Sequence, residues 1–387
     1  MKDGFIKAAS ASPVIKVADT EYNAQRVIET IKAADEMGVK LLVFPELVLT
    51  GCTCYDLTGH NVVLRGAKKA LLEVIAASEG VDMLVFVGLP VAVGSRLYSC
   101  AAAIYDGELL GLVPRENVRG TQFAEPADSY VEVEIDAEHV AVLSTDYVFT
   151  CAALPDLKVA AELGADIDAL VPPSVRHAQA GATVIAQLAS FPETVTSADE
   201  AELTLRSQSR RLHCGMVMAA PGKGESTTDN VFSGLCMIAE NGEVLAASEC
   251  ENSMAVTELD VEYIINTRRE SDDFDLDSDE YYEAVWGGEP VETELTRSYR
   301  KYPHLPADEA DLPTYCERML DIQVSGLVKR MQYAGLDHCV VGISGGVDST
   351  LAVMVSAMAV KKMGLPSTNV VACTLPCFGT SSRTKSN

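Results

Sequence analysis

Hydrophobic positions alternate between two patterns over the first two thirds of the chain. Short apolar runs predict strands, and stretches with apolar residues at three- and four-residue steps predict amphipathic helices. The strands are expected at 5–10, 40–44, 83–89, 98–105, 109–113, 140–143, 169–171, 183–188 and 216–220, and the helices at 21–37, 64–78 and 197–212. This alternation, from Phe5 to about Glu262, predicts a layered α/β domain and not a helix bundle.

Two local signals sharpen the prediction. In the helix at 21–37 one face carries only small or aliphatic residues, and Thr20 stands where an N-cap is expected; the face consists of Ala24, Val27, Ile28, Ile31 and Ala34. Asp106-Gly107 separates two predicted strands. Because a type I′ turn needs positive φ at both central residues, this dipeptide predicts a β-hairpin.

The composition changes between Thr267 and Pro313. An acidic run at 270–283 is followed by Gly287, Gly288 and four prolines, which predicts a solvated acidic linker. A new amphipathic helix is expected at 314–333, burying Met319, Ile322, Val324, Leu327 and Met331, and a strand at 339–343. The expected division is therefore a first domain at 1–266, a linker at 267–313 and a second domain at 314–387.

Composition and charge exclude several classes of function. The chain has 387 residues, 48% of them hydrophobic, which argues against general disorder. The 30 basic and 56 acidic side chains give a formal charge of −26, which repels nucleic acids and anionic membrane surfaces. No apolar run approaches the roughly 18 to 20 residues of a membrane helix, and Met1–Ser10 lacks the apolar segment of a secretory signal. We therefore expect a cytoplasmic protein.

A phosphate-binding turn is predicted in the second domain. The strand that ends with Gly342 and Ile343 leads into Ser344-Gly345-Gly346-Val347-Asp348-Ser349-Thr350, and a helix follows. Adjacent glycines and a helix N-terminus suit a pyrophosphate, so residues 342–350 are the candidate ATP site. Asp348 fits if Mg²⁺ bridges its carboxylate and the phosphates. The alternative, a capping Ser and Asp after a glycine turn, accounts for fewer of these residues.

The turn resembles the pyrophosphate loop of the ATP pyrophosphatase superfamily, and it lacks the Walker lysine. Further on, Cys373–Pro376 and Phe378–Asn387 resemble the second substrate loop of NAD synthetases. That resemblance implies a Rossmann-like parallel-sheet domain. It also implies that Thr380, Ser381, Arg383 and Thr384 contact the substrate.

The first domain resembles a different superfamily. Leu41–Leu47, followed by Thr50-Gly51, is similar to the first signature of the nitrilase superfamily, in which the glutamate, here Glu46, is the general base. Residues 222–229 and 231–234 are similar to the amidase domain of glutamine-dependent NAD synthetases. The resemblance implies a four-layer αββα nitrilase-like sandwich, followed by the start of the Rossmann-like domain.

The family hydrolyses glutamine with a Glu, a Lys and a Cys, and this chain departs from two of the three. Val113-Pro114-Arg115 places Arg115 where the family has its lysine. Alignment on Pro172-Pro173-Ser174 places Gly164 where the family has its nucleophilic cysteine. Glycine has no nucleophile, so we expect the glutaminase to be inactive.

The resemblance implies NAD biosynthesis by ATP- and Mg²⁺-dependent amidation of deamido-NAD. The family takes the nitrogen from glutamine; here we expect free ammonia. The alternative is a non-catalytic nitrilase-like scaffold with a vestigial ligase domain, and a stand-alone amidase is the weakest reading. The resemblance also leads us to expect a homo-oligomer. Since the family's synthetase domain continues well beyond its second substrate loop, we expect the second domain to be incomplete, as in a fragment.

Overall fold

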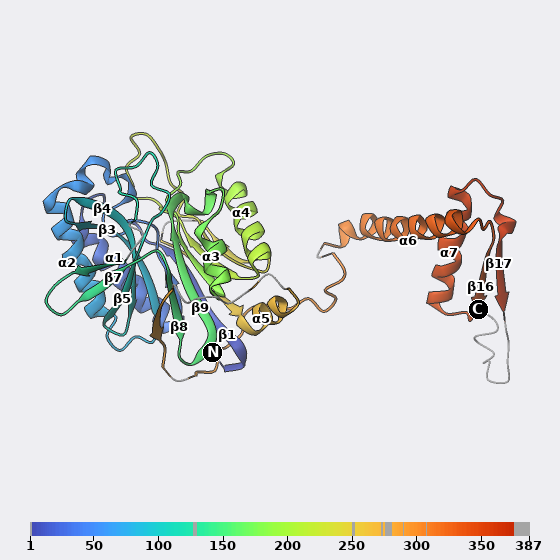
Figure 1. Cartoon of the computed structure of the whole chain (residues 1–387), viewed down its shortest axis with the longest axis horizontal. Coiled ribbons are helices and arrows are strands. Elements are labelled where there is room, and N and C mark those ends of the chain that lie inside the picture. Colours follow the sequence, from blue (N-terminus) through green and yellow to red (C-terminus); the bar gives the residue numbers. More distant parts are fainter. Residues whose placement is uncertain are drawn as a thin grey trace. The chain divides into compact units, whose positions relative to one another are not determined.

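The computed structural model describes residues 2–126, 130–249, 252–271, 274, 281–288, 290–306 and 308–374. The chain divides into two compact units, unit 1 (Met1–Arg297) and unit 2 (Ser298–Asn387) (Figure 1). Each is described by itself below. Within the described part of the chain, no helix combines the length and the apolar character needed to cross a bilayer.

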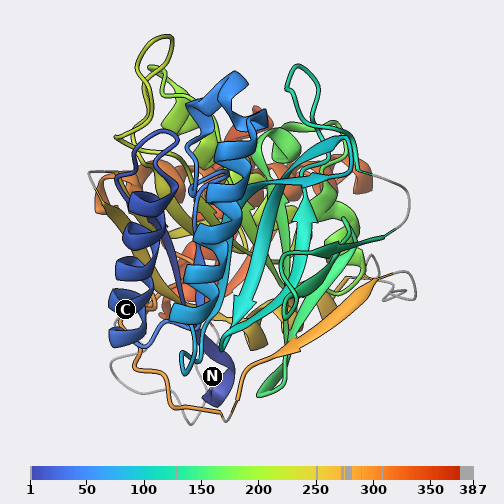
Figure 2. The same cartoon turned by 90° about the vertical axis from the view of Figure 1, so that its left-hand side faces the viewer.

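Eight described strands of unit 1 form its first sheet, in the order β14-β1-β2-β3-β4-β5-β7-β6. Helices α1 (Thr20–Glu36) and α2 (Asn61–Ala77) lie side by side on the outer face of this sheet (Figure 2). The strands are β1 (Phe5–Ser12), β2 (Leu41–Val43), β3 (Leu84–Val93), β4 (Arg96–Tyr105), β5 (Glu108–Pro114), β6 (Val131–Glu134), β7 (Val140–Leu143) and β14 (Ser253–Asp260).

Seven described strands form the second sheet, in the order β13-β12-β11-β10-β9-β8-β15. Helices α3 (Pro173–Gln179) and α4 (Ser197–Leu212) cover its outer face, and α5 (Val261–Arg269) follows β14. The strands are β8 (Tyr147–Cys151), β9 (Leu154–Leu163), β10 (Val184–Leu188), β11 (Gly215–Ala219), β12 (Cys236–Glu240), β13 (Glu243–Ser248) and β15 (Tyr282–Trp286). The described residues of unit 1 also form three 3₁₀ segments: η1 (Lys2–Gly4), η2 (Cys52–Gly59) and η3 (Gly164–Asp168).

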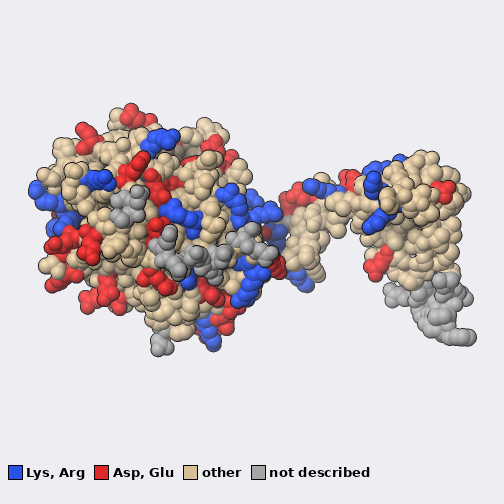
Figure 3. Space-filling view, in the orientation of Figure 1, with Lys and Arg blue, Asp and Glu red and all other residues tan. Residues whose placement is uncertain are grey.

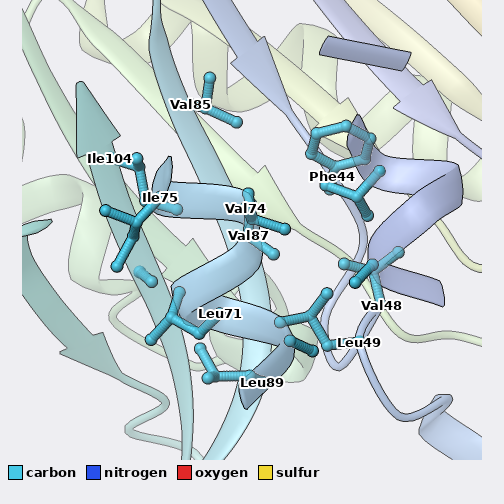
Figure 4. Close-up of a cluster of buried hydrophobic side chains, with 14 of the residues drawn as sticks. Phe44, Val48, Leu49, Leu71, Val74, Ile75, Val85, Val87, Leu89 and Ile104 are labelled. Atoms are coloured by element: carbon cyan, nitrogen blue, oxygen red, sulfur yellow. The ribbon is translucent and has the colours of Figure 1, made fainter. Parts of the chain in front are cut away.

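Three hydrophobic clusters show how these elements are layered. One lies between α1, α2 and the first sheet and includes Leu71, Val74 and Val85 (Figure 4). The second lies between the two sheets, where the rings of Phe86 and Phe149 meet edge to face with centroids 5.4 Å apart. The third lies between the second sheet and α3 and α4. Successive strand residues point to opposite faces, so both sheets are buried on two sides, and the result is the expected αββα sandwich.

Several local predictions are confirmed. The helix at 197–212 has the predicted limits, and every residue of the predicted apolar face of α1 is buried. Asp106 and Gly107 have φ of 46° and 77° and join β4 to β5 as a hairpin. The N-cap of α1 is Asp19 and not Thr20, because the Asp19 carboxylate accepts the N–H of Tyr22.

The predicted strand at 169–171 is wrong. The strand in this part of the chain is β9, which ends at Leu163, and residues 169–171 follow η3 as an irregular segment. Leu170 is fully exposed. Three apolar residues in a row satisfy the strand pattern, but a short run carries no information on burial.

The interpretation of 267–313 as a solvated connector is wrong for its middle part. Residues 282–286 form β15, which pairs in parallel with β8 at the edge of the second sheet. Trp286 is buried there, and its indole N–H donates to the carbonyl of Phe149 over 3.0 Å. Further on, Thr296 and Arg297 donate to the carboxylate of Glu258. This segment is therefore part of unit 1.

Unit 2 is a small α/β unit. Strands β16 (Cys339–Ile343) and β17 (Val370–Thr374) pair in parallel, as a Rossmann-like sheet begins. They are accompanied by η4 (Glu309–Asp311), α6 (Leu312–Ala334), α7 (Val347–Lys362) and η5 (Ser367–Asn369). Val324 and Met331 of α6 are buried as predicted, but Met319 and Ile322 are 47% and 64% exposed. The described core, which centres on Val324, Val355 and Ala359, is too small to cover the whole apolar face of α6.

Candidate active site

Three loops of unit 1 bring Glu46, Arg115 and Gly164 together. Glu46 follows β2, Arg115 follows β5, and Gly164 follows β9 of the other sheet. β2 and β5 run in the same direction, so their carboxyl ends lie at one edge of the first sheet. The N–H of Glu46 donates to Ala189 O over 3.1 Å, which ties this edge to the second sheet. The site therefore lies where the two sheets meet.

Glu46 and Arg115 form a buried ion pair. Arg115 Nη1 lies 3.3 Å from Glu46 Oε1 and 3.2 Å from Oε2, and Ser99 Oγ donates to Oε1 over 2.6 Å. The Glu46 side chain is 1% exposed and that of Arg115 is 11% exposed. Arg115 Nε also donates to the carbonyl of Asn117 over 2.9 Å. A buried carboxylate needs such partners, because an unpaired charge in this place would cost several kcal/mol.

Gly164 faces this ion pair. Its φ of +52° is in the left-handed region, which disfavours residues with a Cβ. A Cβ built at Gly164 would lie 2.5 Å from Glu46 Oε2 and 2.6 Å from both Cζ and Nη1 of Arg115. A side chain at position 164 would thus point directly at the carboxylate and the guanidinium. The structure brings the three predicted positions together, and no nucleophile stands at the third.

Two buried carboxyl groups, those of Asp166 and Glu162, support the turn at Gly164 through hydrogen bonds to backbone N–H groups. Asp166 accepts the N–H groups of Leu163, Glu116 and Asn117 over 3.1, 3.2 and 2.6 Å, and burial raises its pKa to about 6. Glu162 accepts the N–H of Ser174 over 3.1 Å. Burial, and then the charge of Asp166, raise the pKa of Glu162 to about 8, so this group is mostly protonated at neutral pH.

A pocket of about 360 Å³ opens onto the ion pair. Glu46 and Arg115 lie in its wall, and the rest of the lining comes from distant loops, including Tyr55, Phe123 and Asn230. Tyr55 has φ of 42°, which is unusual for an aromatic residue and marks a constrained loop. The pocket offers hydroxyl, amide and aromatic groups around one ion pair, which suits a small polar molecule.

Glu225 and Cys52 are site residues that sequence reasoning missed. The buried carboxylate of Glu225 accepts the N–H groups of Cys52 and Thr53 over 2.8 and 3.0 Å, which joins η2 to the loop at 222–229. Cys52 lines the pocket. Burial, and then the charge of Glu225, raise the pKa of the Cys52 thiol far above its usual value, so it is not a thiolate nucleophile. The partners are 173 positions apart in the sequence, so neither carries a local signal of this contact.

The predicted ATP site in unit 2 is a continuous turn between β16 and α7. Gly345 has φ of +76°, and Gly346 is the N-cap of α7 without a side-chain cap. Hydroxyls of Ser349 and Thr350 each donate to Gly346 O over 3.0 Å. The first N–H groups of a helix have no partner within the helix, so this exposed turn can accept an anion.

The Asp348 position fits a Mg²⁺ ion that is shared with phosphates. Asp348 is exposed in the first turn of α7. The described residues contain no group of three or more potential metal ligands, so any ion here would take most of its oxygens from phosphates and water, as Mg²⁺ prefers. Thr380, Ser381, Arg383 and Thr384, the predicted substrate loop, lie outside the described residues.

Comparisons with known proteins agree with this architecture. Residues 7–269 match the carbon-nitrogen hydrolase family, and residues 319–387 match the NAD synthase family. The chain is 33% identical over 403 residues to a glutamine-dependent NAD(+) synthetase of Mycobacterium leprae, a match that covers 99% of this chain and 59% of the relative. A 24% identical relative from Thermotoga maritima has the same description. The chain thus spans about three fifths of the length of these relatives.

Two solved structures are similar in fold. A glutamine-dependent NAD(+) synthetase from Cytophaga hutchinsonii has a TM-score of 0.58 at 16% identity; the match covers 98% of this chain and 62% of that one. A mutant amidase of the nitrilase superfamily, from Nesterenkonia, has a TM-score of 0.53 and covers 70% of this chain. The carbon-nitrogen hydrolase match spans well over half of the chain, and the αββα sandwich agrees with it; the chain belongs to the carbon-nitrogen hydrolase family.

Proposed function

We propose that the chain acts in NAD biosynthesis, by the ATP-dependent amidation of deamido-NAD with free ammonia. The similarity to glutamine-dependent NAD(+) synthetases over 99% of the chain supports the reaction. The main evidence for ammonia as the nitrogen source is the geometry at Gly164, where the side chain that would attack glutamine is missing. We infer that the glutaminase function of unit 1 is lost.

In the proposed reaction, ATP first adenylates the nicotinic-acid carboxylate of deamido-NAD and pyrophosphate leaves. Ammonia then attacks the acyl carbon, AMP leaves, and NAD is formed. A role of the turn at 344–350 in holding the phosphates is supported by its exposure and by its position at the N-terminus of α7. Asp348 would hold Mg²⁺, which when bound supplies positive charge next to the phosphates. We assign substrate contacts to Thr380, Ser381, Arg383 and Thr384.

Unit 1 would then serve as a binding or assembly domain. A triad of this kind needs a thiolate to form the thioester, a carboxylate to move protons, and a cation to stabilise the oxyanion. Here the Glu46 carboxylate is paired with Arg115. Arg115 keeps a positive charge at the position of the family's lysine, but its planar guanidinium has a different shape from an ammonium group. We also propose that the sandwich forms a homo-oligomer.

The alternative is a non-catalytic nitrilase-like scaffold with a vestigial ligase unit. The absence of a side chain at Gly164 and the pairing of Glu46 with Arg115 agree with a unit 1 that has no catalytic role. Binding of ATP separates the two functions, because a vestigial unit has no reason to keep a working phosphate site.

The test is NAD formation by the purified chain from deamido-NAD, ATP and Mg²⁺, with ammonium or glutamine in parallel. We expect NAD from ammonium and none from glutamine, and loss of the ammonium-dependent reaction in Asp348→Ala. Equal rates from glutamine and ammonium would contradict the loss of glutaminase. No NAD from either source, together with no binding of Mg-ATP in a calorimetric titration, would favour the scaffold.

A further inference from the structure

The guanidinium of Arg115 lies in the space next to Gly164 that a side chain at position 164 would need. The ideal Cβ position is 2.6 Å from both Cζ and Nη1 of Arg115, well inside the separation of non-bonded heavy atoms. The missing nucleophile and the large cation are therefore not two independent departures. The absence of a side chain at position 164 leaves space for the Arg115 guanidinium, and the guanidinium then excludes a side chain at position 164.

Arg115 is not free to move out of this space. Its Nε donates to Asn117 O over 2.9 Å, and its Nη1 is shared by the two oxygens of Glu46. Glu46 is held in turn by Ser99 Oγ. If the guanidinium swung away, the buried Glu46 carboxylate would lose its charged partner, so the ion pair keeps the side chain in place.

We propose that the Arg115 side chain fills the amidase centre and blocks covalent chemistry there, whatever residue stands at position 164. We call this steric block the Arg115 plug. The proposal rests on the assignment of Glu46, Arg115 and Gly164 to that centre in the proposed function. It adds that loss of the nucleophile is not the sole block: a thiol introduced at position 164 would meet the Arg115 guanidinium as well as Glu46 Oε2, and a smaller side chain at position 115 removes the first of these contacts. Lysine keeps the charge for Glu46 but lacks the planar, three-nitrogen head group.

The first test is the reactivity of a thiol at position 164 in the full chain. Gly164→Cys is compared with Arg115→Lys/Gly164→Cys by iodoacetamide labelling, and each peptide is quantified by mass spectrometry. The pocket gives the reagent access to Glu46 and Arg115, the two residues that a side chain at position 164 would face. Exposed Cys316 in unit 2 is labelled in both proteins and serves as the internal standard.

We expect labelling at position 164, relative to Cys316, to be at least tenfold faster when Arg115→Lys is present. Equal labelling rates in the two backgrounds would overturn the proposal. If Gly164→Cys folds only together with Arg115→Lys, that result supports the plug directly. If neither protein folds, position 164 rejects a side chain regardless of residue 115, and the proposal fails.

The second test is a double-mutant cycle that needs no thiol. Gly164→Ala adds only a Cβ, and its thermal midpoint is measured in the natural and in the Arg115→Lys backgrounds. The positive φ and the approach to Glu46 Oε2 are common to both backgrounds, so their effects cancel. The plug predicts a drop several degrees larger with arginine present, and equal drops would contradict it. Neither test depends on ATP or NAD, so failure of the proposed function leaves both results interpretable.

Discussion

The two candidate sites of this chain are built in opposite ways. The centre at Glu46, Arg115 and Gly164 is buried and is assembled from three strand ends that are far apart in the sequence. The turn at 344–350 is exposed and is made of consecutive residues between one strand and one helix. A buried centre ties its chemistry to the stability of the sandwich, whereas an exposed turn can lose its function with little effect on folding.

The surroundings of the two sites differ as well. Unit 1 buries both faces of its two sheets, and acidic and basic side chains are intermixed over the face shown in Figure 3. The described core of unit 2 is far smaller. A substitution in unit 1 should therefore change the free energy of unfolding most, and one in the turn should change ligand affinity most.

The largest expected effect is that of Arg115→Ala. It leaves the Glu46 carboxylate buried without its cation, which should destabilise unit 1 by about 3–5 kcal/mol. Denaturant titration followed by the fluorescence of Trp286, the sole tryptophan, measures this, because Trp286 is buried in unit 1. The matched control is Lys69→Ala, which breaks an i,i+4 surface pair between the exposed Lys69 and the partly buried Glu73 and should cost about 0.2–0.5 kcal/mol. Similar losses for both variants would show that the Glu46–Arg115 pair is not a buried support.

The stability of unit 1 should also depend on pH. The pKa of Glu162 is raised from 4.5 to about 8, so between these values the unfolded chain has lost a proton that the folded chain retains. Stability should therefore fall as pH rises from about 4.5 to 8, by more than the roughly 1.4 kcal/mol that corresponds to one pKa unit.

The control for this prediction is Glu162→Gln, which cannot titrate. It should flatten that part of the pH profile. The pKa of Asp166 is raised from 3.8 to about 6, so the variant should still lose some stability as the pH rises between these two values. A profile of Glu162→Gln parallel to that of the natural chain would place the titrating group elsewhere.

The smallest effect on folding is expected in unit 2. Asp348→Ala removes an exposed carboxylate, so the stability should change by no more than about 0.5 kcal/mol. Affinity for Mg-ATP should fall at least tenfold, which is about 1.4 kcal/mol of binding energy. Calorimetric titration with and without Mg²⁺ measures this. Unchanged affinity would show that Asp348 does not contribute to Mg-ATP binding. A large loss of stability would show that the exposed turn supports the fold, as the buried site does.

Sequence reasoning predicted what depends on neighbouring residues. The helix at 197–212, the buried face of α1 and the hairpin at Asp106-Gly107 follow from periodicity and turn chemistry. The turn at 344–350 has the same local character, and the structure shows the expected strand, glycine turn and helix.

What sequence reasoning missed depends on distant partners. Strand β15 is paired with β8, and Tyr282 is opposite Tyr147 across more than a hundred residues of chain. The acidic residues around this segment are typical of a solvated linker. Its strand is stabilised by pairing with β8 at the edge of the sheet, and this partner is distant in the sequence. In the same way, the positions of Arg115 and Gly164 could be found by their spacing to other motifs. The sequence could not show that the Arg115 side chain occupies the space next to Gly164, because this depends on how two loops pack in three dimensions.

Whether the amidase centre is closed to covalent chemistry can be measured as glutamate release from glutamine. This assay needs unit 1 alone to be active and does not depend on ATP. We expect no release above that of a Glu46→Gln variant prepared in parallel. Release that is saturable in glutamine and abolished by Glu46→Gln would show that the centre works without a side chain at position 164, and would contradict the account.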